Sequence, residues 1–499
     1  MDTKRTDRSG SVFDNPQPDA VYRKALRSRA SCTRHCGSDE SISYPARLAP
    51  APELDAALGL RELLIGAGLE PGVEEFDRER GLILGVAPDG FGTARSALAM
   101  ASCARALGFK PYWMDLDSYT ATVAGKAVAA RRARETRLDR LAKRCCPCVQ
   151  RAAAAAQERS LRKLSTNAVD QKCTELMAPL FRNVPKDIPV LATHAWLAQA
   201  AVHAGMRHVL NAVPDNLPLA ARLAEGSLHT VQTHHAYQGY RVLFGMDGKR
   251  VLHPMPEHML ACAGHYVSDV LVSNLATDCA ARTARKTGGA PLRFLLHLDG
   301  SGAQQEMLAA VLRHLRPAIM RNHAAVLLDL GAHGGAWQQF TAAVPGLEGV
   351  AKLHFEDLDT RCAFAASLLR DGLEGVHVFR DTRRASAAWC TEQLLRAADV
   401  LVTAPDDLAF APIPKLFLPG RNALERWNAV HSAELGDGTM ECADLPHVTQ
   451  MLDLFLYEDT MLMDFLENII KNQIGGVYDG AYWAVRLAMG MKRSATQGA

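Results

Sequence analysis

The feature that most constrains this chain is a short apolar run that leads into a glycine-rich turn and a helix-forming stretch. The run Gly81–Val86 is bounded by glycine and has the length of one buried strand. The turn 88–93 is followed by an alanine-rich stretch at 94–107, by Gly108 as a helix stop, and by a second apolar run at 110–114. This order predicts a β-α-β unit, in which the two strands are parallel.

The same alternation of strand and helix patterns continues along the chain. Further strands are expected at 188–192, 208–213, 230–232, 293–298, 324–329, 376–379, 400–403 and 415–418. Alternating strands and helices favour an α/β fold with helices on both faces of a parallel sheet. We therefore expect two doubly wound, Rossmann-like domains at 58–270 and 290–449, with a linker near 265–290.

The two ends of the chain differ in composition from these domains. Residues 1–57 contain few large apolar residues and many Ser, Arg and Pro, which predicts a disordered N-terminal extension. The tail 450–499 carries a Leu, Met and aromatic stripe that is typical of helices with one buried face.

An alanine-rich insertion at 121–166 carries most of the charge asymmetry of the chain. Between residues 126 and 163 there are twelve Lys or Arg and three acidic residues, although the whole chain has a net charge of only +2. Pro147 predicts that the insertion is two helices. It is either a solvated helical hairpin or a surface for anionic lipid head groups or another polyanion. The near-neutral total gives no general attraction to nucleic acid, so no nucleic-acid partner is expected.

Cysteine content and hydropathy bear on the compartment. Twelve cysteines in 499 residues are far fewer than a disulfide scaffold carries. No run of 18 apolar residues and no apolar signal-like segment near Met1 is present. We expect a cytoplasmic protein, with segment 126–163 as a peripheral membrane contact if the lipid interpretation holds. The group Cys32, His35 and Cys36 lacks a further ligand pair nearby, so neither a metal nor a cofactor is expected.

Two glycine-rich turns open the two series of strands. Segment 89–93 reads Asp-Gly-Phe-Gly-Thr and segment 299–303 reads Asp-Gly-Ser-Gly-Ala. Neither segment fits the dinucleotide-binding fingerprint of Rossmann folds or the P-loop of nucleoside triphosphatases. Glycines after a strand nevertheless let backbone N–H groups approach an anion at a helix N-terminus. Because ligands of open α/β sheets lie beyond the carboxyl ends of the strands, we expect both turns to face a central cleft.

The motifs of the second series resemble those of GT-B glycosyltransferases. Segment 299–303 is similar to the family's glycine-rich loop, Ala398–Val402 to its Ala-Asp strand, and Lys415–Pro419 to its next strand. Segment 425–429 with Gly436 approximates the family's Gln-x-x-Asn-Ala motif and the glycine that follows it. The chain resembles most nearly glycosyltransferase family 28, which includes the N-acetylglucosaminyl transferase of peptidoglycan synthesis and the monogalactosyldiacylglycerol synthases. It would be a divergent branch of that family, and the resemblance covers residues 81–436.

This resemblance implies a GT-B fold in which two Rossmann-like domains face a central cleft and the C-terminal helices at 450–499 cross back to the first domain. It implies metal-independent transfer of a sugar from a nucleotide-sugar donor to a hydroxyl acceptor, which could be lipid-linked. The donor-binding residues would be Gly300, Ser301, Gly302, Glu425, Asn428, Glu434 and Asp437. The acceptor loop would contain Gly90, Gly92 and Thr93.

Three residues of the first domain are candidates for the base that the acceptor hydroxyl needs. Asp89 lies in the first glycine-rich turn, and His194 and Asp215 each follow a predicted strand, so they should lie at the carboxyl edge of the sheet. Structural roles compete with this hypothesis. Asp89 or His194 can cap a turn or sit in the core, and Asp215 lies in a turn-like Pro-Asp-Asn-Leu-Pro run.

Three departures from the family pattern keep other functions open. The family's candidate base His is Thr93 here, its Gln is Glu425, and segment 408–414 is too short for the helix that carries the ribose-binding acid. Contacts to ribose and sugar therefore do not carry over intact. The alternatives are a sugar-nucleotide epimerase or hydrolase on the same fold, or a non-catalytic binding module with a degenerate GT-B scaffold. Glu434 and Asp437 could equally mark the end of a helix.

Overall fold

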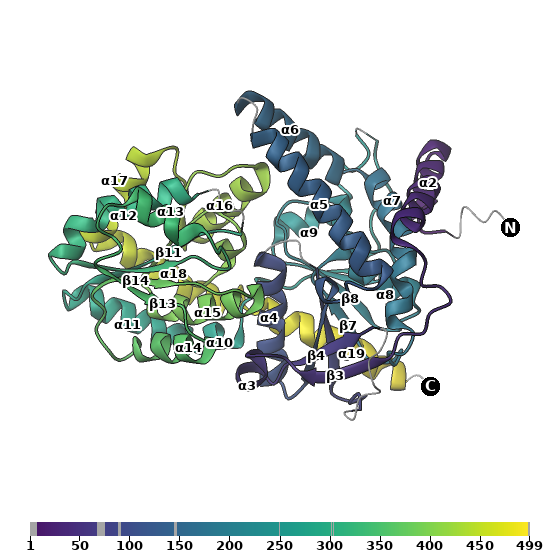
Figure 1. The fold of residues 1–499 in the computed structure, drawn as a ribbon, viewed down its shortest axis with the longest axis horizontal. Coiled ribbons are helices and arrows are strands. Elements are labelled where there is room, and N and C mark those ends of the chain that lie inside the picture. Colours follow the sequence, from purple (N-terminus) through teal and green to yellow (C-terminus); the bar gives the residue numbers. More distant parts are fainter. Residues whose placement is uncertain are drawn as a thin grey trace. The chain divides into compact units, whose positions relative to one another are not determined.

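The computed structural model describes residues 7–66, 75–87, 91–143, 147–248, 250–300, 302 and 304–497. The chain divides into two compact units, each built around one large sheet (Figure 1). Unit 1 comprises Met1–Asp89, Cys103–Ala263 and Tyr482–Ala499, and unit 2 comprises Gly90–Ser102 and Gly264–Ala481. The prediction of an α/β chain with two parallel-sheet domains and a helical C-terminal tail is confirmed.

The sheet of unit 1 has eight strands in the order β10-β9-β8-β7-β5-β6-β4-β3, and only β3 runs antiparallel to its neighbour. Its central strands are apolar on both faces, as a sheet covered by helices requires. The strands are β3 (Ala46–Pro50), β4 (Arg61–Ile65), β5 (Gly81–Val86), β6 (Lys110–Asp115), β7 (Val190–Ala192), β8 (Val209–Val213), β9 (Leu228–Val231) and β10 (Leu260–Cys262). A separate hairpin pairs β1 (Ser11–Val12) with β2 (Asn15–Pro16).

The helices of unit 1 come from all parts of its sequence, including both ends. The α-helices are α2 (Asp19–Cys36), α3 (Leu54–Leu58), α5 (Val123–Lys143), α6 (Pro147–Leu161), α7 (Leu164–Thr174), α8 (Ala195–His203) and α9 (His234–Arg241). Short 3-10 segments are η1 (Leu116–Ser118), η2 (Glu175–Phe181), η3 (Ala220–Arg222) and η4 (Glu257–Met259). Two helices span both units, namely α4 (Phe91–Ala106) and α19 (Gly480–Gln497).

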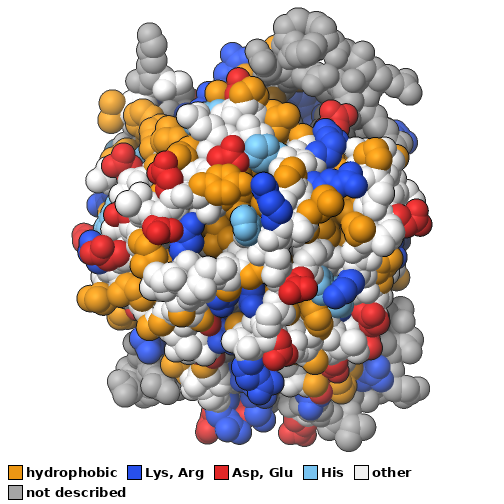
Figure 2. Space-filling view, turned by 90° about the vertical axis from the view of Figure 1, so that its left-hand side faces the viewer, with side chains coloured by type: hydrophobic (Ala, Val, Ile, Leu, Met, Phe, Trp, Pro, Cys, Tyr) orange, Lys and Arg blue, Asp and Glu red, His pale blue; other side chains and the backbone are white. Residues whose placement is uncertain are grey.

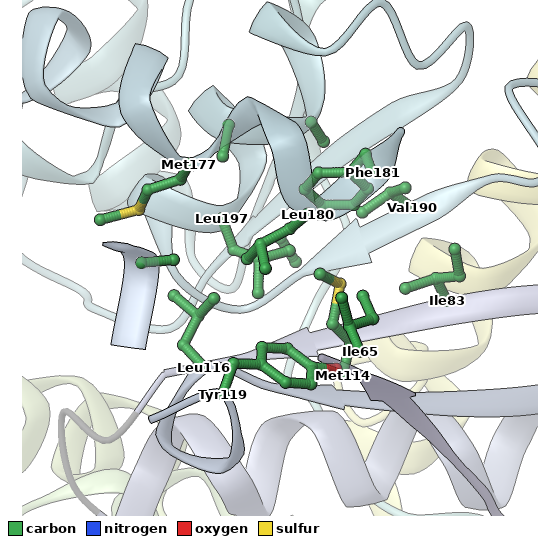
Figure 3. Close-up of a cluster of buried hydrophobic side chains, with 14 of the residues drawn as sticks. Ile65, Ile83, Met114, Leu116, Tyr119, Met177, Leu180, Phe181, Val190 and Leu197 are labelled. Atoms are coloured by element: carbon green, nitrogen blue, oxygen red, sulfur yellow. The ribbon is translucent and has the colours of Figure 1, made fainter. Parts of the chain in front are cut away.

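The core of unit 1 lies between the sheet on one side and η2 with the helical segments that follow β6 on the other. Figure 3 shows Met114 and Ile83 of the sheet facing Leu180 and Phe181 of η2. Tyr119 lies in the same cluster and donates its hydroxyl proton to the carbonyl of Leu63. Burial of these side chains is the main favourable term for this half of the chain.

The expectation that residues 1–57 form a disordered extension is wrong for the described part, which begins at residue 7. Helix α2 packs along α7, and Ala25 of α2 is fully buried. Asp7 accepts from Lys172 of α7 at 2.6 Å, and β3 pairs with β4 at the sheet edge. The polar composition was misleading because a helix that lies on a surface needs only a narrow apolar stripe to be held.

The basic insertion forms two long helices and part of a third. Helix α6 begins at Pro147, where proline is tolerated because the first N–H groups of a helix need no partner. The side chains of Arg132 and Arg134 on α5 are exposed, as are those of Ala152 and Arg159 on α6. Among the described helices, none has the combination of length and hydropathy that a bilayer crossing requires.

The sheet of unit 2 has seven strands, all parallel, in the order β13-β14-β12-β11-β15-β16-β17. Helices α12, α13 and α17 lie on one side of this sheet, and α14 and α15 lie on the other (Figure 1). The strands are β11 (Leu292–His297), β12 (Ala324–Asp329), β13 (Ala351–His354), β14 (Gly375–Phe379), β15 (Val400–Thr403), β16 (Lys415–Phe417) and β17 (Gly438–Glu441). The helices are α10 (Asp269–Val272), α11 (Leu275–Thr287), α12 (Gln305–Met320), α13 (Ala336–Ala343), α14 (Leu358–Ser367), α15 (Arg384–Ala397), η5 (Asp407–Phe410), α16 (Ala423–Leu435), α17 (Leu445–Tyr457) and α18 (Thr460–Ile474).

Two expectations about the segments that join the domains need correction. Residues 265–290, expected as a linker, form α10 and α11 of unit 2. Arg282 of α11 is buried and donates to the carbonyls of Leu395 and Ala398, which ties this helix to α15. Within the tail, α17 and α18 belong to unit 2, whereas residues 482–499 group with unit 1.

Candidate functional site

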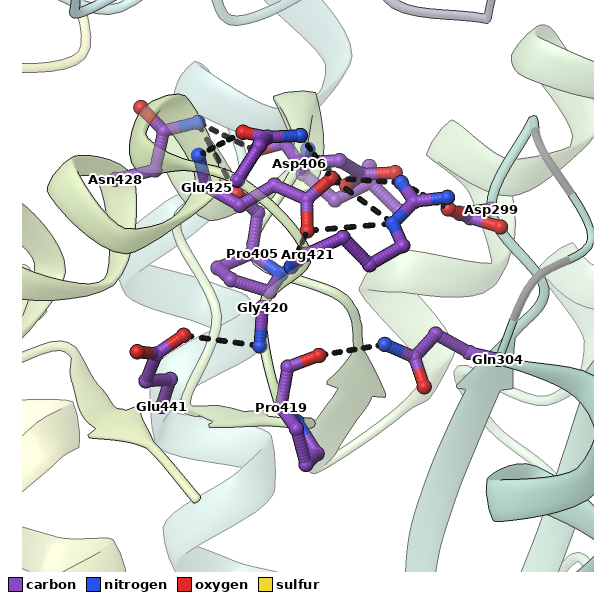
Figure 4. Close-up of polar contacts among 12 residues, drawn as sticks. Asp299, Gln304, Pro405, Asp406, Pro419, Gly420, Arg421, Glu425, Asn428 and Glu441 are labelled. Atoms are coloured by element: carbon purple, nitrogen blue, oxygen red, sulfur yellow. Dashed lines mark hydrogen bonds and ion pairs between the residues drawn. The ribbon is translucent and has the colours of Figure 1, made fainter. Parts of the chain in front are cut away.

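The candidate site lies where the chain order of the unit 2 sheet reverses. From β11 the chain builds outward through β12 on one side, and later through β15, β16 and β17 on the other. In open parallel sheets, ligands bind beyond the carboxyl ends of the two strands at such a switch point. Here those ends are His297 of β11 and Thr403 of β15, and the polar residues described next follow them (Figure 4).

The turn after β11 is closed by its own backbone and by a histidine. Gly302 donates its N–H to the carbonyl of Asp299 at 3.0 Å and has a φ of +66°, which favours glycine. The Nε2 atom of His333 lies 2.8 Å from the same carbonyl. Gly300 is exposed at the tip of the turn, and Ser301 lies outside the described residues. The turn thus presents the buried Asp299 side chain to the edge of the sheet.

The connection between β15 and β16 is short, as the sequence predicts. It contains only the 3-10 segment η5, so no helix is present that could carry the family's ribose-binding acid. In its place the loop carries two carboxyl groups, Asp406 and Asp407. The carboxylate of Asp406 caps η5 by accepting from the N–H of Leu408 at 3.1 Å.

Helix α16 begins with a reciprocal cap that accounts for Glu425. Asn422 accepts from the N–H of Glu425 at 3.0 Å, and Glu425 accepts from the side-chain amide of Asn422 at 2.9 Å. Glu425 also accepts from the N–H of Arg421 at 2.8 Å. This arrangement satisfies the N–H group of Glu425 in the first helical turn and that of Arg421 just before the helix.

Arg421 joins the loops that follow β11 and β16. Its Nη2 atom lies 2.7 Å from a carboxylate oxygen of Asp299 and 2.7 Å from one of Glu425 (Figure 4). Burial opposes the charge of Arg421, but Glu425, Asp299 and Asp406 raise the pKa of its guanidinium above the usual value. The guanidinium therefore organises the carboxylates of this edge and keeps part of its own surface exposed.

Amide side chains hold the remaining loops of the edge in place. Gln304, just before α12, donates to the carbonyl of Pro419 at 2.6 Å. Asn428, one turn along α16 from Glu425, donates to the carbonyl of Pro405 at 3.1 Å. Of the predicted donor-binding residues, Glu425 and Asn428 are therefore brought to the same edge as Gly300 and Gly302.

A histidine and an aspartate that sequence reasoning missed lie at the strand ends beneath these loops. The Nδ1 atom of His297 is 2.9 Å from a carboxylate oxygen of Asp329, and both side chains are buried. Asp329 also accepts from Thr391 of α15 at 2.6 Å and from the N–H of Gly331 at 2.9 Å. Burial would lower the pKa of His297, but Asp329 raises it above the usual value. The imidazole is therefore stabilised in its charged form.

Asp406 is an acidic group of this edge whose pKa is raised. Burial raises its pKa to about 7, with further contributions from the nearby Asp407 and Asp299 carboxylates, while His297 acts in the opposite direction. Asp406 keeps part of its surface exposed. A carboxyl group with these properties can hold or release a proton near neutral pH.

The predicted acceptor loop at 90–93 has a different role in the structure. Helix α4 begins at Phe91, so Gly92 and Thr93 lie in its first turn, and this part of α4 belongs to unit 2 rather than to the first domain. A Cβ at Gly92 would collide with the carboxylate of Asp407. The glycine lets a carboxylate of the protein itself approach the helix N-terminus, where negative charge is favourable. Asp89 and Gly90 lie outside the described residues.

The other predicted catalytic residues follow neighbouring strands of unit 1. His194 is the N-cap of α8 and accepts from the N–H of Trp196 at 3.1 Å. Asp215 follows β8 and forms an ion pair with Arg222. Both side chains are buried at the carboxyl edge of the sheet. These contacts are structural, and a catalytic role for either residue stays a prediction.

The last two predicted donor-binding residues are placed differently from each other. Glu434 is exposed near the end of α16. Asp437 is fully buried, with Lys415 at 2.8 Å and the hydroxyl of Tyr478 at 2.7 Å. Its carboxylate is used to compensate a buried ammonium group, and removal of one partner of such a pair is costly.

The residues that sequence reasoning missed at this edge are His297, Asp329, Asp406 and Arg421. A polar residue at the end of an otherwise apolar strand was the available signal for His297 and Asp329. Arg421 and Asp406 lie in turns between predicted elements, and only the tertiary structure shows that they meet Asp299. Among the described side chains, no group of three His, Cys, Asp or Glu residues is arranged to hold a metal ion.

Comparison with known families finds two models, each described as a domain of unknown function. The first, DUF6937, matches residues 11–242, and the second, DUF6938, matches residues 255–489. The division between the two ranges lies at residues 243–254, before β10. A search of curated proteins found no match.

Comparison with solved structures finds enzymes of sugar-nucleotide and trehalose metabolism. A UDP-GlcNAc 2-epimerase from Neisseria meningitidis bound to UDP-GlcNAc is 9% identical with a TM-score of 0.42, and the match covers 84% of this chain and 99% of that one. S. aureus MnaA in complex with UDP is 10% identical (TM-score 0.37; 82% and 94% covered). The α,α-trehalose 6-phosphate synthase from Burkholderia multivorans is 14% identical (TM-score 0.37; 68% and 82% covered).

Proposed function

We propose that this protein is a sugar-nucleotide-binding enzyme whose ligand binds at the carboxyl edge of the unit 2 sheet. The observation that carries the proposal is the arrangement around Arg421, in which loops after β11, β15 and β16 bring carboxylates, an amide and a guanidinium to the switch point. Carboxylates and amides bind sugar hydroxyls, and a guanidinium binds phosphate. The resemblance to GT-B enzymes supports a nucleotide sugar as the ligand.

Transfer of the sugar to a hydroxyl acceptor is the reaction that we propose first, in the manner of glycosyltransferase family 28. Such a transferase stabilises the departing diphosphate with backbone N–H groups and basic side chains, without an obligatory metal. We assign this role to Gly300 and Arg421, whereas Gly302 keeps the turn closed because its N–H is bound to the carbonyl of Asp299. His194, Asp215 or Asp89 would then act as the base for the acceptor.

A sugar-nucleotide epimerase or hydrolase is the second candidate, and the acidic character of the edge favours it. Asp299, Asp406 and Asp407 come together on two loops, and Asp406 can hold a proton near neutral pH. Acid–base chemistry on a bound sugar nucleotide needs such groups and needs no acceptor. Product analysis of incubations without an acceptor separates the two reactions.

Thermal denaturation with a panel of nucleotide sugars tests the proposal. We expect UDP-, GDP- or dTDP-linked sugars to raise the melting temperature, because a ligand that binds only the folded state stabilises it. Replacement of the guanidinium in Arg421→Ala should weaken binding by about tenfold or more, since a charge-assisted bond contributes roughly 1.5–3 kcal/mol. Arg370→Ala, at an exposed position of unit 2, is the matched control. An absence of stabilisation by every nucleotide sugar would contradict the proposal and favour a non-catalytic module.

We also propose that the basic segment 126–163 contacts anionic lipid head groups. The support is the local excess of Lys and Arg together with exposed apolar side chains on the loop that packs against the base of the hairpin. Phe244 and Val251 are 66% and 94% exposed, and the neighbouring Met246 accepts through its carbonyl from the N–H of Leu164. Basic and apolar side chains together suit a membrane surface.

A further inference from the structure

His297, the last residue of β11, lies in a row of polar side chains across the end of the unit 2 sheet. It is paired in register with Asp329 of β12 on one side. On the other side Leu296 pairs with Val402 of β15, so Thr403 is the next residue of β15 along the same register. Residues paired in register on parallel strands share a face of the sheet, so all three side chains point to the face that α15 covers. Asp406 follows Thr403 by three residues.

His297 uses one of its two ring nitrogens within the sheet. Because Nδ1 is held by Asp329, Nε2 points away from that carboxylate. Nε2 of His297 and Oγ1 of Thr403 are both fully buried, and neither has a hydrogen-bond partner among the described residues. Since buried polar groups are nearly always hydrogen-bonded, these two atoms mark a place for a polar group of a ligand.

The charges that face Asp406 come from every loop of this edge and are mostly negative. Asp299 and Asp407 lie close enough to raise the pKa of Asp406. Two further carboxylates are already paired with basic groups, Asp329 with His297 and Glu425 with Arg421. The basic groups are Arg421, His297 and Arg95, and Arg95 is already paired with Glu392 at 2.7 Å. His333 contributes an imidazole on the carbonyl of Asp299. An ionised Asp406 would therefore repel the negative charge of a ligand phosphate.

We propose that a ligand phosphate binds at this edge together with one proton, which Asp406 holds beside the His297–Asp329 pair. The inference rests on the proposed function, because the phosphate is that of the nucleotide sugar. Burial and the neighbouring carboxylates raise the pKa of Asp406 to about 7, so the group is partly ionised at neutral pH before the ligand arrives. A phosphate nearby disfavours the ionised form further, and the carboxyl takes up a proton from the solvent. The proton returns to the solvent when the ligand leaves.

Isothermal titration calorimetry of the full chain with UDP-N-acetylglucosamine, GDP-mannose and dTDP-glucose tests the inference. These diphosphate diesters keep a fixed charge near neutral pH, so any proton taken up belongs to the protein. Titrations in buffers of different ionisation enthalpy measure that proton directly. We expect uptake near pH 7.5 and an affinity that falls by up to about tenfold per pH unit as pH rises above about 7, the limit for one linked proton.

The variant Asp406→Asn removes the proton site and keeps the shape of the side chain. It should bind with no proton uptake, with an affinity independent of pH between about 7 and 8.5, and more tightly than the unaltered protein at the upper end. The exposed Glu458→Gln is the control and should behave as the unaltered protein. Binding without uptake, or uptake that persists in Asp406→Asn, overturns this inference and leaves the proposed function intact. An absence of binding of all three nucleotide sugars at every pH overturns both.

Discussion

Glu392 of α15 shows how unit 2 holds charged residues in its interior. The side chains of Glu392 and Arg95 are 0% and 2% exposed, and they pair at 2.7 Å. Ser268 donates its hydroxyl proton to the other carboxylate oxygen of Glu392. Arg95 also donates to the carbonyl of Asp407 at 3.1 Å, so the pair links the first turns of α4 to the loop that carries the candidate site.

Neutralisation of this buried acid should destabilise unit 2. In Glu392→Gln the Arg95 guanidinium stays buried without its counter-charge, at a cost of about 3 kcal/mol. Urea denaturation followed by tryptophan fluorescence measures the change. Glu467→Gln removes one partner of the exposed pair between Glu467 and Lys471 and should leave the denaturation midpoint unchanged. Equal effects of the two substitutions would show that burial of the Arg95 pair is not important for stability.

Gly92 and the cap of α16 show how much of the candidate site depends on details at the scale of a residue. The glycine-rich turn predicts close approach of an anion to a helix N-terminus, and such an approach does occur, but the anion is Asp407 of the protein itself. The sequence could not distinguish a ligand from a side chain more than 300 residues away in the chain. Glu425 is likewise predicted from the sequence to bind a ligand. In the structure its carboxylate accepts from the Asn422 side chain and the Arg421 N–H at the start of α16.

At the scale of the element, the N-terminal helix α2 gives the clearest difference between sequence and structure. Its exposed face is rich in Arg and Lys, whereas Ala25 lies against the rest of unit 1 with no exposed surface. Ion pairs between Arg29 and Glu175 and between Lys172 and Asp7 join this segment to α7 and η2. The segment is therefore a structural part of unit 1.

A charge placed under α2 should release it. Ala25→Asp buries a carboxylate without a partner and should cost roughly 2–4 kcal/mol of folding stability. Limited trypsin digestion should then cleave α2, which has several Arg and Lys residues, faster than in the unaltered protein. The neighbouring Lys24→Asp introduces the same side chain at an exposed position and should change neither stability nor cleavage. If residues 7–57 were disordered, the two variants would be cleaved equally fast.

For the whole molecule, the net charge of +2 conceals an uneven distribution. Basic residues gather on the helical hairpin of unit 1, whereas the face of unit 2 in Figure 2 shows basic, acidic and apolar side chains interspersed. Local excess charge attracts anionic surfaces even when the total is near zero, and the attraction is screened by salt.

The basic hairpin predicts salt-dependent membrane binding. Co-sedimentation should detect the protein with vesicles that contain phosphatidylserine and not with phosphatidylcholine alone. Substitution of Arg134, Arg137 and Arg159 by Gln should weaken binding by about a hundredfold, at about 1 kcal/mol for each basic residue near the surface. The matched control substitutes Arg23, Lys24 and Arg27 of α2, which removes equal charge from another exposed helix. If the hairpin substitutions left vesicle binding unchanged, another part of the protein would make the membrane contact.

Runs of apolar residues predicted the central strands of both sheets, because a parallel strand buried on both faces must be apolar throughout. The strands β3, β4, β10, β13 and β17, which lie at or next to the sheet edges, were not predicted. Strand order and the polar loops beyond the strands were decided only by tertiary structure. Asp299 is far in the chain from Asp406 and Arg421, and their meeting depends on β11 lying beside β15. The short loop after β15 was visible in the sequence, but the carboxyl groups that it brings to the switch point acquire their properties from burial and from each other. A sequence records side-chain chemistry, whereas proximity and desolvation, which set charge and pKa, exist only in the folded chain.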